Sequence, residues 1–377
     1  MEKETYVGDF SIDSLFTTLQ NSSFKEIFLV RGKRSYELCG AKLVIENIKS
    51  LFNYTITEFF DFQENPKIED LEKGLRFMSN IKADLIIGIG GGSVLDMSKL
   101  IRFFYSYSGD ITNTQFEKQK GLIPLITIPT TAGTGSEVTH FAVLYKEKIK
   151  YSIEHNDVLP DMAIVHPSFT YNNSPYLTAC TGFDALAHAI EAYWNINATE
   201  ESDTYAVKAI KLLYPNLSVV VNAPAKEARI KVSEGAYWAG KAINITKTTA
   251  PHAVSYPFTT YYNYPHGHAV ALTFPYFAEY NIKKVSELST KLSRDRYVDK
   301  MKYLCSIIGT TIESDIRLLF HNYIKKIGLS FNLLHDFQVE LIIKNINTQR
   351  MVNNPMRFTL EQLRRYINNT NTEYEGN

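Results

Sequence analysis

Short apolar runs and helix-spaced apolar positions alternate over the first 130 residues of the chain. The runs that predict buried strands are 26–30, 54–60, 83–89 and 124–129. The predicted helices are 41–51, 68–80 and one that starts at Ser93. Strands that alternate with helices favour a parallel sheet covered by helices on both faces, so this part of the chain is predicted to be an α/β domain.

The pattern changes after about residue 167, where strand signals almost vanish and helical spacing dominates. The predicted helices are 180–194, 203–213, 226–246, 274–281, 297–308, 314–327 and 360–368. We therefore expect an α/β dinucleotide-binding domain over residues 1–167 and an all-α metal-binding and substrate domain over residues 168–377.

The length and composition of the chain argue against several classes of protein. A chain of 377 residues usually forms more than one compact core. The 40 basic and 40 acidic side chains cancel, which argues against a general nucleic-acid binder. Three distant cysteines indicate neither a disulfide framework nor a cysteine zinc site. We see no secretory signal and no apolar run long enough to span a membrane, so we expect a cytoplasmic protein without a membrane partner.

A glycine-rich segment, Gly90-Gly91-Gly92-Ser93, follows a predicted strand and opens a predicted helix. Glycines let the backbone approach a phosphate, and the helix N-terminus offers unpaired N–H groups with a positive dipole end. Ser93 could cap the helix, with Asp96 three residues later as in a capping box. Taken alone, the segment fits a tight turn without a ligand equally well.

A second loop, residues 129–137, also follows a strand and reads Pro-Thr-Thr-Ala-Gly-Thr-Gly-Ser-Glu. It combines hydroxyl side chains with small residues, as expected where a bulky ligand must lie close to the backbone. A plain turn does not require four hydroxyl residues and two glycines in nine positions. The two loops together favour a nucleotide site.

Four residues have the chemistry of metal ligands. Asp184 and His188 are four residues apart in an apolar helical segment, so they share one face of a helix. His252 and His266 lie in later segments of the second domain. Three imidazoles and one carboxylate suit Fe(II), Zn(II), Co(II) or Mn(II), and an open coordination position would let the metal polarise a substrate oxygen. A surface ion pair is the alternative for Asp184 and His188 taken alone.

These segments together resemble the iron-containing (group III) alcohol dehydrogenase family over nearly the whole chain. Residues 90–99 look like its GGGSxxDxxK pattern, and residues 129–137 look like its PTTAGTGSE loop. The order Asp184, His188, His252 and His266 is similar to its metal ligands, and residues 353–355 resemble a recurrent Asn-Asn-Pro segment.

The resemblance implies a dehydroquinate synthase-like fold with NAD(P)H in the cleft between the domains and a divalent metal. Fe²⁺ is the metal that it favours, and Zn²⁺ is the alternative. The residues it places on the cofactor are Gly90, Gly91, Gly92, Ser93, Asp96, Thr130, Thr131, Thr134 and Lys150. The residues after the first strand, 31–35, include no acidic side chain to hold a ribose hydroxyl, so NAD and NADP both stay open. A homo-oligomer, such as a dimer, is also implied.

The chain departs from the family pattern at the position of a histidine linked to proton transfer, which is Tyr256 here. His268 could supply part of the proton relay, because imidazole titrates near neutral pH. We therefore expect His268 and Tyr256 to be catalytic.

The segment before His252 is unusually polar for this family. Thr248 and Lys241 precede His252 by 4 and 11 residues, and a helix would place them on the ligand-bearing face. A lysine with hydroxyl groups near the metal suggests an anionic substrate, and a solvated lysine face is the alternative. Residues 241–272 look most like the phosphonoacetaldehyde reductase branch, which implies reduction of phosphonoacetaldehyde to 2-hydroxyethylphosphonate.

Three other functions compete with this one. The chain could be a general short-chain alcohol dehydrogenase of the same family. It could be a glycerol dehydrogenase-like or dehydroquinate synthase-like enzyme, against which the loop 129–137 argues. It could also be a non-catalytic metal- or nucleotide-binding protein, against which the complete set of ligand-type residues argues.

Overall fold

The structure is a computed structural model that describes residues 3–105, 107, 109–111, 116, 121–331 and 338–372. The chain forms two compact units, Met1–Asn173 and Ser174–Asn377. The division falls between strand β8 (Met162–Val165) and helix α6 (Pro175–Trp194), the same stretch in which the sequence pattern changes.

The first unit is built on a six-stranded parallel sheet with the order β1-β8-β5-β4-β2-β3. Its strands are β1 (Glu4–Val7), β2 (Glu26–Arg31), β3 (Thr55–Phe59), β4 (Leu85–Gly90), β5 (Leu125–Pro129) and β8. A separate antiparallel pair consists of β6 (Phe141–Lys146) and β7 (Ile149–Glu154).

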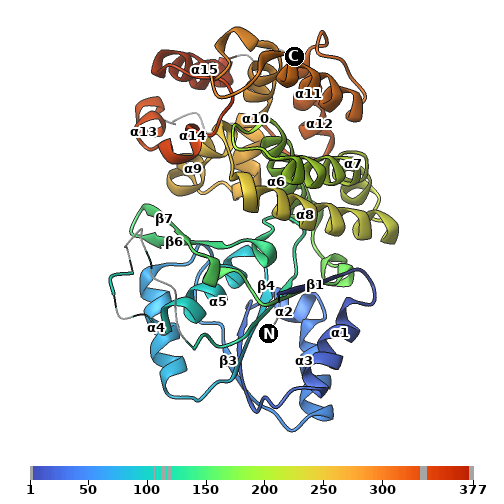
Figure 1. The fold of residues 1–377 in the computed structure, drawn as a ribbon, viewed down its shortest axis with the longest axis vertical. Helices are drawn as coiled ribbons and strands as arrows, with labels where there is room; N and C mark the ends of the chain where they lie inside the picture. The colour runs from blue at the N-terminus through green and yellow to red at the C-terminus, as the bar shows by residue number, and fades with distance from the viewer. Residues whose placement is uncertain are drawn as a thin grey trace. The chain divides into compact units, whose positions relative to one another are not determined.

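Helices cover both faces of this sheet (Figure 1). They are α1 (Ser11–Gln20), α2 (Ser35–Leu38), α3 (Ala41–Leu51), α4 (Ile68–Ser79) and α5 (Gly92–Tyr105). In β2, Ile27 and Leu29 pack with α1, α2 and α3, whereas Phe28 and Val30 pack with α4 and α5. Because successive side chains point to opposite faces, a strand buried on both sides needs an unbroken apolar run.

The strand order reverses between β2 and β4, since β3 lies on one side of β2 and the remaining strands lie on the other. In open α/β sheets, ligands bind beyond the carboxyl ends of the strands at such a reversal. The glycine segment directly follows β4. The topology therefore places this segment where a dinucleotide is expected.

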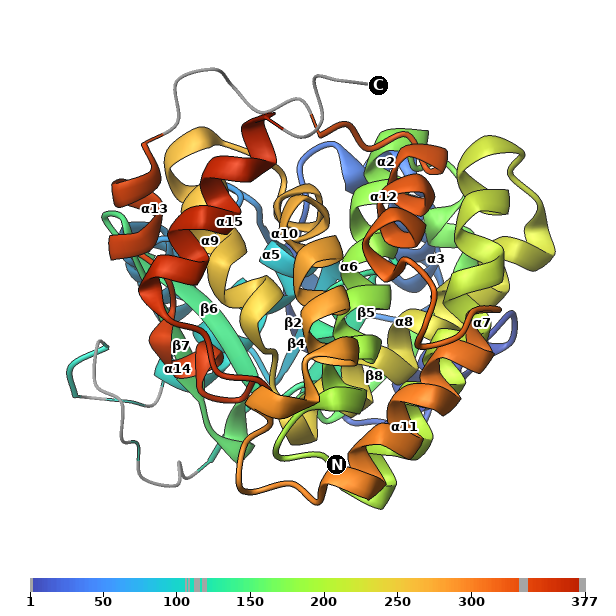
Figure 2. The same ribbon diagram turned by 90° about the horizontal axis from the view of Figure 1, so that it is seen from above.

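The second unit is helical, and its described residues contain no strand beyond an isolated bridge between Leu288 and Met356. Its helices are α6, α7 (Glu200–Asn222), α8 (Lys226–Thr246), α9 (Ala250–Tyr262), α10 (His266–Lys283), α11 (Arg294–Ile307), α12 (Ile316–Lys326), α13 (Val339–Lys344), α14 (Thr348–Met351) and α15 (Leu360–Thr372). Figure 2 shows α6 and α10 among the other helices of this unit. Gly267 of α10 permits their close contact, because an added Cβ would lie 1.9 Å from the Cys180 carbonyl oxygen.

The prediction of an α/β unit followed by an all-α unit is confirmed. The predicted helices 203–213 and 274–281 were much too short, and α9 is among the helices that were missed. These three helices contain Pro215, Pro275 and Pro257 respectively, in their interiors. A proline removes one backbone donor and disfavours helix in the preceding residue, which argues locally for a helix end. Packing within the unit keeps all three helices continuous.

A search of the described helices found none that combines the length and apolar character needed to cross a lipid bilayer.

Candidate active site

The glycine segment joins β4 to α5, and its three glycines face different surroundings. A Cβ on Gly90 would lie 2.5 Å from a Val94 methyl carbon, and one on Gly92 would lie 2.6 Å from Thr134 Cγ2. A Cβ on Gly91 would meet nothing nearer than Thr131, at 3.7 Å. Gly90 and Gly92 are thus required by packing, while Gly91 leaves its surface open for a ligand.

The capping role predicted for Ser93 is wrong, because α5 already begins at Gly92. The Ser93 hydroxyl instead accepts a hydrogen bond from the Asn65 backbone N–H at 3.1 Å. Asp96 forms no capping box either: its Oδ1 accepts from the Ser136 hydroxyl at 2.5 Å, and its Oδ2 accepts from Val143 N–H at 3.0 Å. Its carboxylate therefore organises the neighbouring loop and β6.

Lys99 holds the second loop from the same helix. Its ammonium is fully buried and donates to the carbonyl oxygens of Ser136 (2.8 Å) and Phe141 (2.6 Å) and to the hydroxyls of Ser136 and Thr139 (both 3.1 Å). A buried ammonium is tolerated only when such acceptors surround it. The Asp-x-x-Lys part of the motif thus fixes the loop 129–137 onto α5.

The arrangement of the two loops fits a nucleotide. Thr130 donates its N–H to the Gly90 carbonyl at 2.9 Å, and Thr131 lies beside Gly91. The buried Thr130 hydroxyl has no hydrogen-bond partner among the described residues, and a buried hydroxyl normally has one. A ligand over Gly91 would supply this partner. Lys150 lies on β7, opposite Tyr145 of β6, and its contact with a cofactor stays a prediction.

Two acidic residues from outside the charged turn after β2 lie close to its basic side chains. This proximity was not predicted from the sequence. Glu58 of β3 accepts from Arg31 Nε at 2.7 Å, and Asp61 lies 3.6 Å from Lys33 Nζ. The Arg31 guanidinium also lies over the Phe60 ring, 3.8 Å from its centroid. Acidic and basic groups therefore both lie near this turn, so the choice between NAD and NADP stays open.

In the second unit, one carboxylate oxygen faces three imidazoles. Asp184 Oδ1 lies 3.2 Å from His252 Nε2, 3.7 Å from His266 Nε2 and 3.8 Å from His188 Nε2. Asp184, His188 and His252 are buried, whereas His266 is partly exposed. The His188 and His252 rings stack with centroids 4.5 Å apart. Helices α6, α9 and α10 thus bring together all four residues predicted as ligands.

The charges and spacings of this cluster fit a divalent cation. Burial raises the pKa of Asp184, but the three histidines outweigh burial and hold that pKa well below its usual range. Burial lowers the pKa of His252, but Glu191 and Asp184 outweigh it and raise the pKa to about 10. Asp184, His252 and His266 present ligand atoms within 4.8 Å of one another. Ligands about 2.0–2.2 Å from one ion lie about 3–3.5 Å apart, close to the distances observed.

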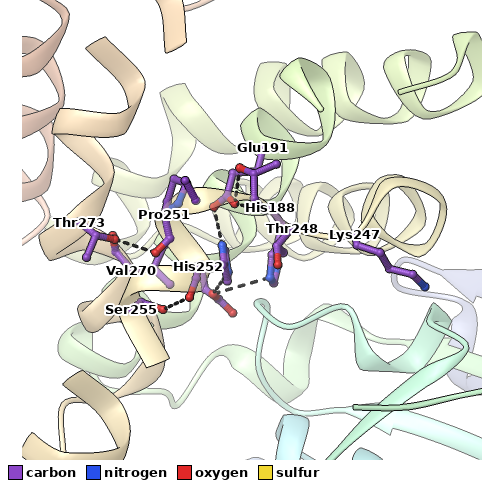
Figure 3. A network of polar contacts seen from close by, with 12 residues as sticks. His188, Glu191, Lys247, Thr248, Pro251, His252, Ser255, Val270 and Thr273 are labelled. Atoms are coloured by element: carbon purple, nitrogen blue, oxygen red, sulfur yellow. Dashed lines mark hydrogen bonds and ion pairs between the residues drawn. The ribbon is translucent and has the colours of Figure 1, made fainter. Parts of the chain in front are cut away.

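Sequence reasoning missed Glu191, which directly contacts one of these histidines. Glu191 is fully buried on α6, and its Oε1 is hydrogen-bonded to His252 Nδ1. Its Oε2 accepts from Thr249 N–H at 2.6 Å and from the Thr249 hydroxyl at 2.8 Å (Figure 3). The available signal was spacing, because Glu191 follows Asp184 by seven residues and so shares its helix face.

The turn between α8 and α9 positions His252 and is anchored at each residue. Asn195 donates to the Lys247 carbonyl at 3.1 Å, and Asn353 donates to the Thr248 carbonyl at 3.0 Å. The adjacent Asn354 forms a reciprocal amide pair with Asn281. The Asn-Asn-Pro segment therefore supports the chain that carries His252.

His268 and Tyr256 are both held in contacts within this unit. His268 Nε2 lies 2.7 Å from the Ser330 carbonyl, which only accepts, so His268 Nδ1 accepts from the Tyr176 hydroxyl at 2.9 Å. Burial lowers the pKa of His268. The Tyr256 ring stacks on His266 at a centroid distance of 5.6 Å. Their role in a proton relay stays a prediction, and His268 could serve in it only by giving up one of these bonds.

Lys241 and His252 do not lie on one continuous helix, contrary to the expectation from the sequence, because α8 ends at Thr246 and α9 begins at Ala250. The Lys241 ammonium lies 5.4 Å from the centroid of the Tyr205 ring on α7. Thr248 lies in the turn, and its buried hydroxyl has no hydrogen-bond partner among the described residues. The argument for Lys241 from its position is therefore wrong, whereas Thr248 lies four residues before His252 on the anchored turn.

A glycine segment at the reversal of a parallel sheet and a carboxylate–histidine cluster in a helical unit fit an enzyme that uses a nucleotide cofactor and a metal. Comparison with known families agrees with this class. The profile described as "Iron-containing alcohol dehydrogenase" matches residues 3–167, and "Fe-containing alcohol dehydrogenase family, C-terminal" matches residues 178–362. The chain belongs to the iron-containing alcohol dehydrogenase family, whose enzymes work with a divalent metal and NAD(P).

Individual relatives span most of the chain. Long-chain-alcohol dehydrogenase 1 of Geobacillus thermodenitrificans is 36% identical over 73% of this chain and 71% of its own length. Alcohol dehydrogenase 4 of Saccharomyces cerevisiae is 29% identical over 95% of this chain and 94% of its own. The crystal structure of sulfoacetaldehyde reductase from Bifidobacterium kashiwanohense in complex with NAD+ has a TM-score of 0.86 and 27% identity, covering 98% of this chain and 97% of that one.

Replacing Gly91 by alanine should weaken NAD(P)H binding without unfolding the protein. The new methyl group meets no protein atom nearer than 3.7 Å but covers the surface offered to the pyrophosphate. We expect the Kd for NAD(P)H to rise at least about tenfold and the free energy of unfolding to change by less than about 1 kcal/mol. Fluorescence titration and chemical denaturation measure the two. Gly92→Ala, which collides with Thr134, should lower stability as well. An unchanged Kd for Gly91→Ala would argue against this cradle.

Replacing His266 by alanine should abolish metal retention and turnover. The loss should exceed the roughly 10- to 100-fold cost of removing only a ligand's hydrogen-bond partner, because a ligand itself is removed. Metal content after gel filtration and the aldehyde reduction rate report both effects. His321→Ala is the matched control, since His321 is a buried histidine that stacks on Phe331 at 4.3 Å. Full activity of His266→Ala without metal would refute the site.

Proposed function

We propose that the protein reduces a short aldehyde carrying an anionic tail, such as phosphonoacetaldehyde, to the corresponding alcohol, here 2-hydroxyethylphosphonate. The observation that carries the proposal is the backbone of Lys247, with φ 65° and ψ −176°. This region is populated almost only by glycine and costs a residue with a side chain about 1–3 kcal/mol. A lysine in such a conformation, five residues before His252, indicates a requirement for its side chain.

The neighbouring Thr248 supports a polar ligand at this turn. Its buried hydroxyl lacks a partner among the described residues, and a phosphonate oxygen would accept a hydrogen bond from it. An ammonium and a hydroxyl on one rigid turn can form charge-assisted hydrogen bonds to an anionic group. Figure 3 shows the Lys247 side chain extending away from the His252 ring, so an anionic tail bound by this ammonium would point away from the imidazoles.

A divalent metal held by Asp184, His188, His252 and His266 would supply Lewis-acid polarisation of the carbonyl, and NAD(P)H would supply the hydride. The protein's own contribution is to orient the aldehyde by its anionic tail, so that the carbonyl is held at the histidine cluster. The relative named sulfoacetaldehyde reductase favours this reaction class, since sulfoacetaldehyde is also a short aldehyde with an anionic group. A general short-chain alcohol dehydrogenase of the same family remains the second candidate. The other two relatives are named as alcohol dehydrogenases, one of them for long-chain alcohols, and neither name indicates an anionic substrate.

Initial rates of NADPH and NADH oxidation by the Fe(II)-loaded protein test the proposal, with phosphonoacetaldehyde compared with propanal. We expect a higher kcat/KM for phosphonoacetaldehyde. Lys247→Gly should reduce that preference about 10- to 100-fold, the equivalent of one hydrogen bond to a charged group at about 1.5–3 kcal/mol. It should also raise the free energy of unfolding by about 1 kcal/mol, because glycine relieves the backbone strain but costs some chain entropy.

Lys241→Ala separates the two lysines. If the preference is lost with Lys241→Ala and kept with Lys247→Gly, the expectation from the sequence is right and the assignment to Lys247 is wrong. If the unmodified enzyme prefers propanal, the protein remains an alcohol dehydrogenase of this family and the anionic substrate is rejected.

A further inference from the structure

A chain of buried hydrogen bonds ends at His252. Trp194 Nε1 lies 3.0 Å from the Thr249 hydroxyl, which lies 2.8 Å from Glu191 Oε2, and Glu191 Oε1 is bonded to His252 Nδ1. All four residues are at most 1% exposed. Bulk water therefore cannot substitute for any of these contacts.

The chemistry of the groups fixes the direction of each bond. An indole N–H can only donate, so the Thr249 oxygen accepts from Trp194 and its one proton points to Glu191. Glu191 Oε2 also accepts from the Thr249 backbone N–H. An ionised carboxylate has no proton to give, so Glu191 Oε1 accepts from His252 Nδ1–H. Once it binds a metal, His252 is neutral; with the proton on Nδ1, its lone pair is on Nε2, the atom that lies 3.2 Å from Asp184 Oδ1.

We propose that Glu191 is a positioning residue that holds His252 in the Nδ1–H tautomer and thereby sets the affinity of the metal at the cluster. The inference rests on the metal site of the proposed function but not on the substrate. The same carboxylate accepts from the backbone N–H of Thr249, the residue directly before α9, so it fixes both the imidazole and the start of the helix from which it projects. One side chain thus controls the tautomer, the ring orientation and the ring position.

Glu191→Gln tests the proposal because the amide has nearly the same shape but only one accepting oxygen. If that oxygen faces His252, the amide NH₂ opposes the Thr249 backbone N–H. If the NH₂ faces His252, Nδ1 must accept, which puts the proton on Nε2 and blocks metal binding. Both orientations predict a Kd for Zn²⁺ or Co²⁺ that is about 10- to 100-fold higher than in the unmodified protein. Competition with a chromophoric chelator measures the Kd, and the visible spectrum of the Co²⁺ form reports altered ligand geometry.

Asn195→Ala is the matched control. Among the described residues, the Asn195 side chain donates to the Lys247 carbonyl of the same turn and accepts from Asn197 N–H, and it forms no hydrogen bond with Glu191 or His252. We expect it to lower the melting temperature while changing the metal Kd less than about threefold. Equal loss of affinity in Asn195→Ala and Glu191→Gln would mean that rigidity of the turn, and not the tautomer, sets affinity, and would overturn the proposal.

A measurement on the unmodified protein covers the case in which Glu191→Gln does not fold. The ¹⁵N shifts of His252 in the Zn²⁺-loaded protein should show a protonated Nδ1 and a metal-bound Nε2. A metal-bound Nδ1 would refute the assignment. If the unmodified protein binds no metal, the cluster itself fails as a metal site. If the unmodified and Glu191→Gln proteins bind metal equally, only the role of Glu191 fails.

Discussion

A buried carboxylate requires compensating positive charge, and Asp184 imposes this requirement on the second unit. Its Oδ1 lies within 3.8 Å of three imidazole nitrogens that come from three helices. Two features bring these rings together. Gly267 lets α10 approach α6 closely, and the hydrogen bond between Glu191 and the Thr249 N–H fixes the residue at which α9 begins. A divalent cation bound between this carboxylate and the three imidazoles would supply that charge directly, and for this reason we interpret the arrangement as a metal-binding site.

Lys99 shows the contrasting case in the first unit. Its ammonium is as deeply buried as Asp184, but four protein oxygens at 2.6–3.1 Å accept its hydrogen bonds. A charge satisfied in this way needs no ligand and acts as a structural link between α5 and the loop 129–137. The Thr130 hydroxyl in the same loop is also buried but has no hydrogen-bond partner among the described residues. We therefore expect Thr130 to face the ligand, whereas Lys99 is structural.

The sequence predicted the elements whose apolar pattern is continuous. Helices 41–51 and 226–246 have the bounds expected, and strand 83–89 agrees with β4 within two residues. Three of the helices that were shortened or missed, α7, α9 and α10, contain interior prolines, whose local signal favours a helix end although packing overrides it. The four ligand-type residues were predicted because their residue types and spacing are informative. The role of Glu191 and the strained turn at Lys247 were not predicted. Both depend on contacts from residues that are far apart in the sequence, such as Trp194, Asn195 and Asn353.

In the proposed function, the turn at Lys247 connects substrate preference with the metal site. A strained conformation persists only when its surroundings hold it, and here hydrogen bonds fix the carbonyls of Lys247 and Thr248 and the N–H of Thr249. The last of these bonds uses the same carboxylate that binds His252. A glycine would adopt this conformation without strain, so the strain at Lys247 indicates that its side chain is required. In the proposed function this side chain binds the anionic tail, and the turn that holds the strain also orients a metal ligand. Substrate specificity could therefore change at this position without rebuilding the metal cluster.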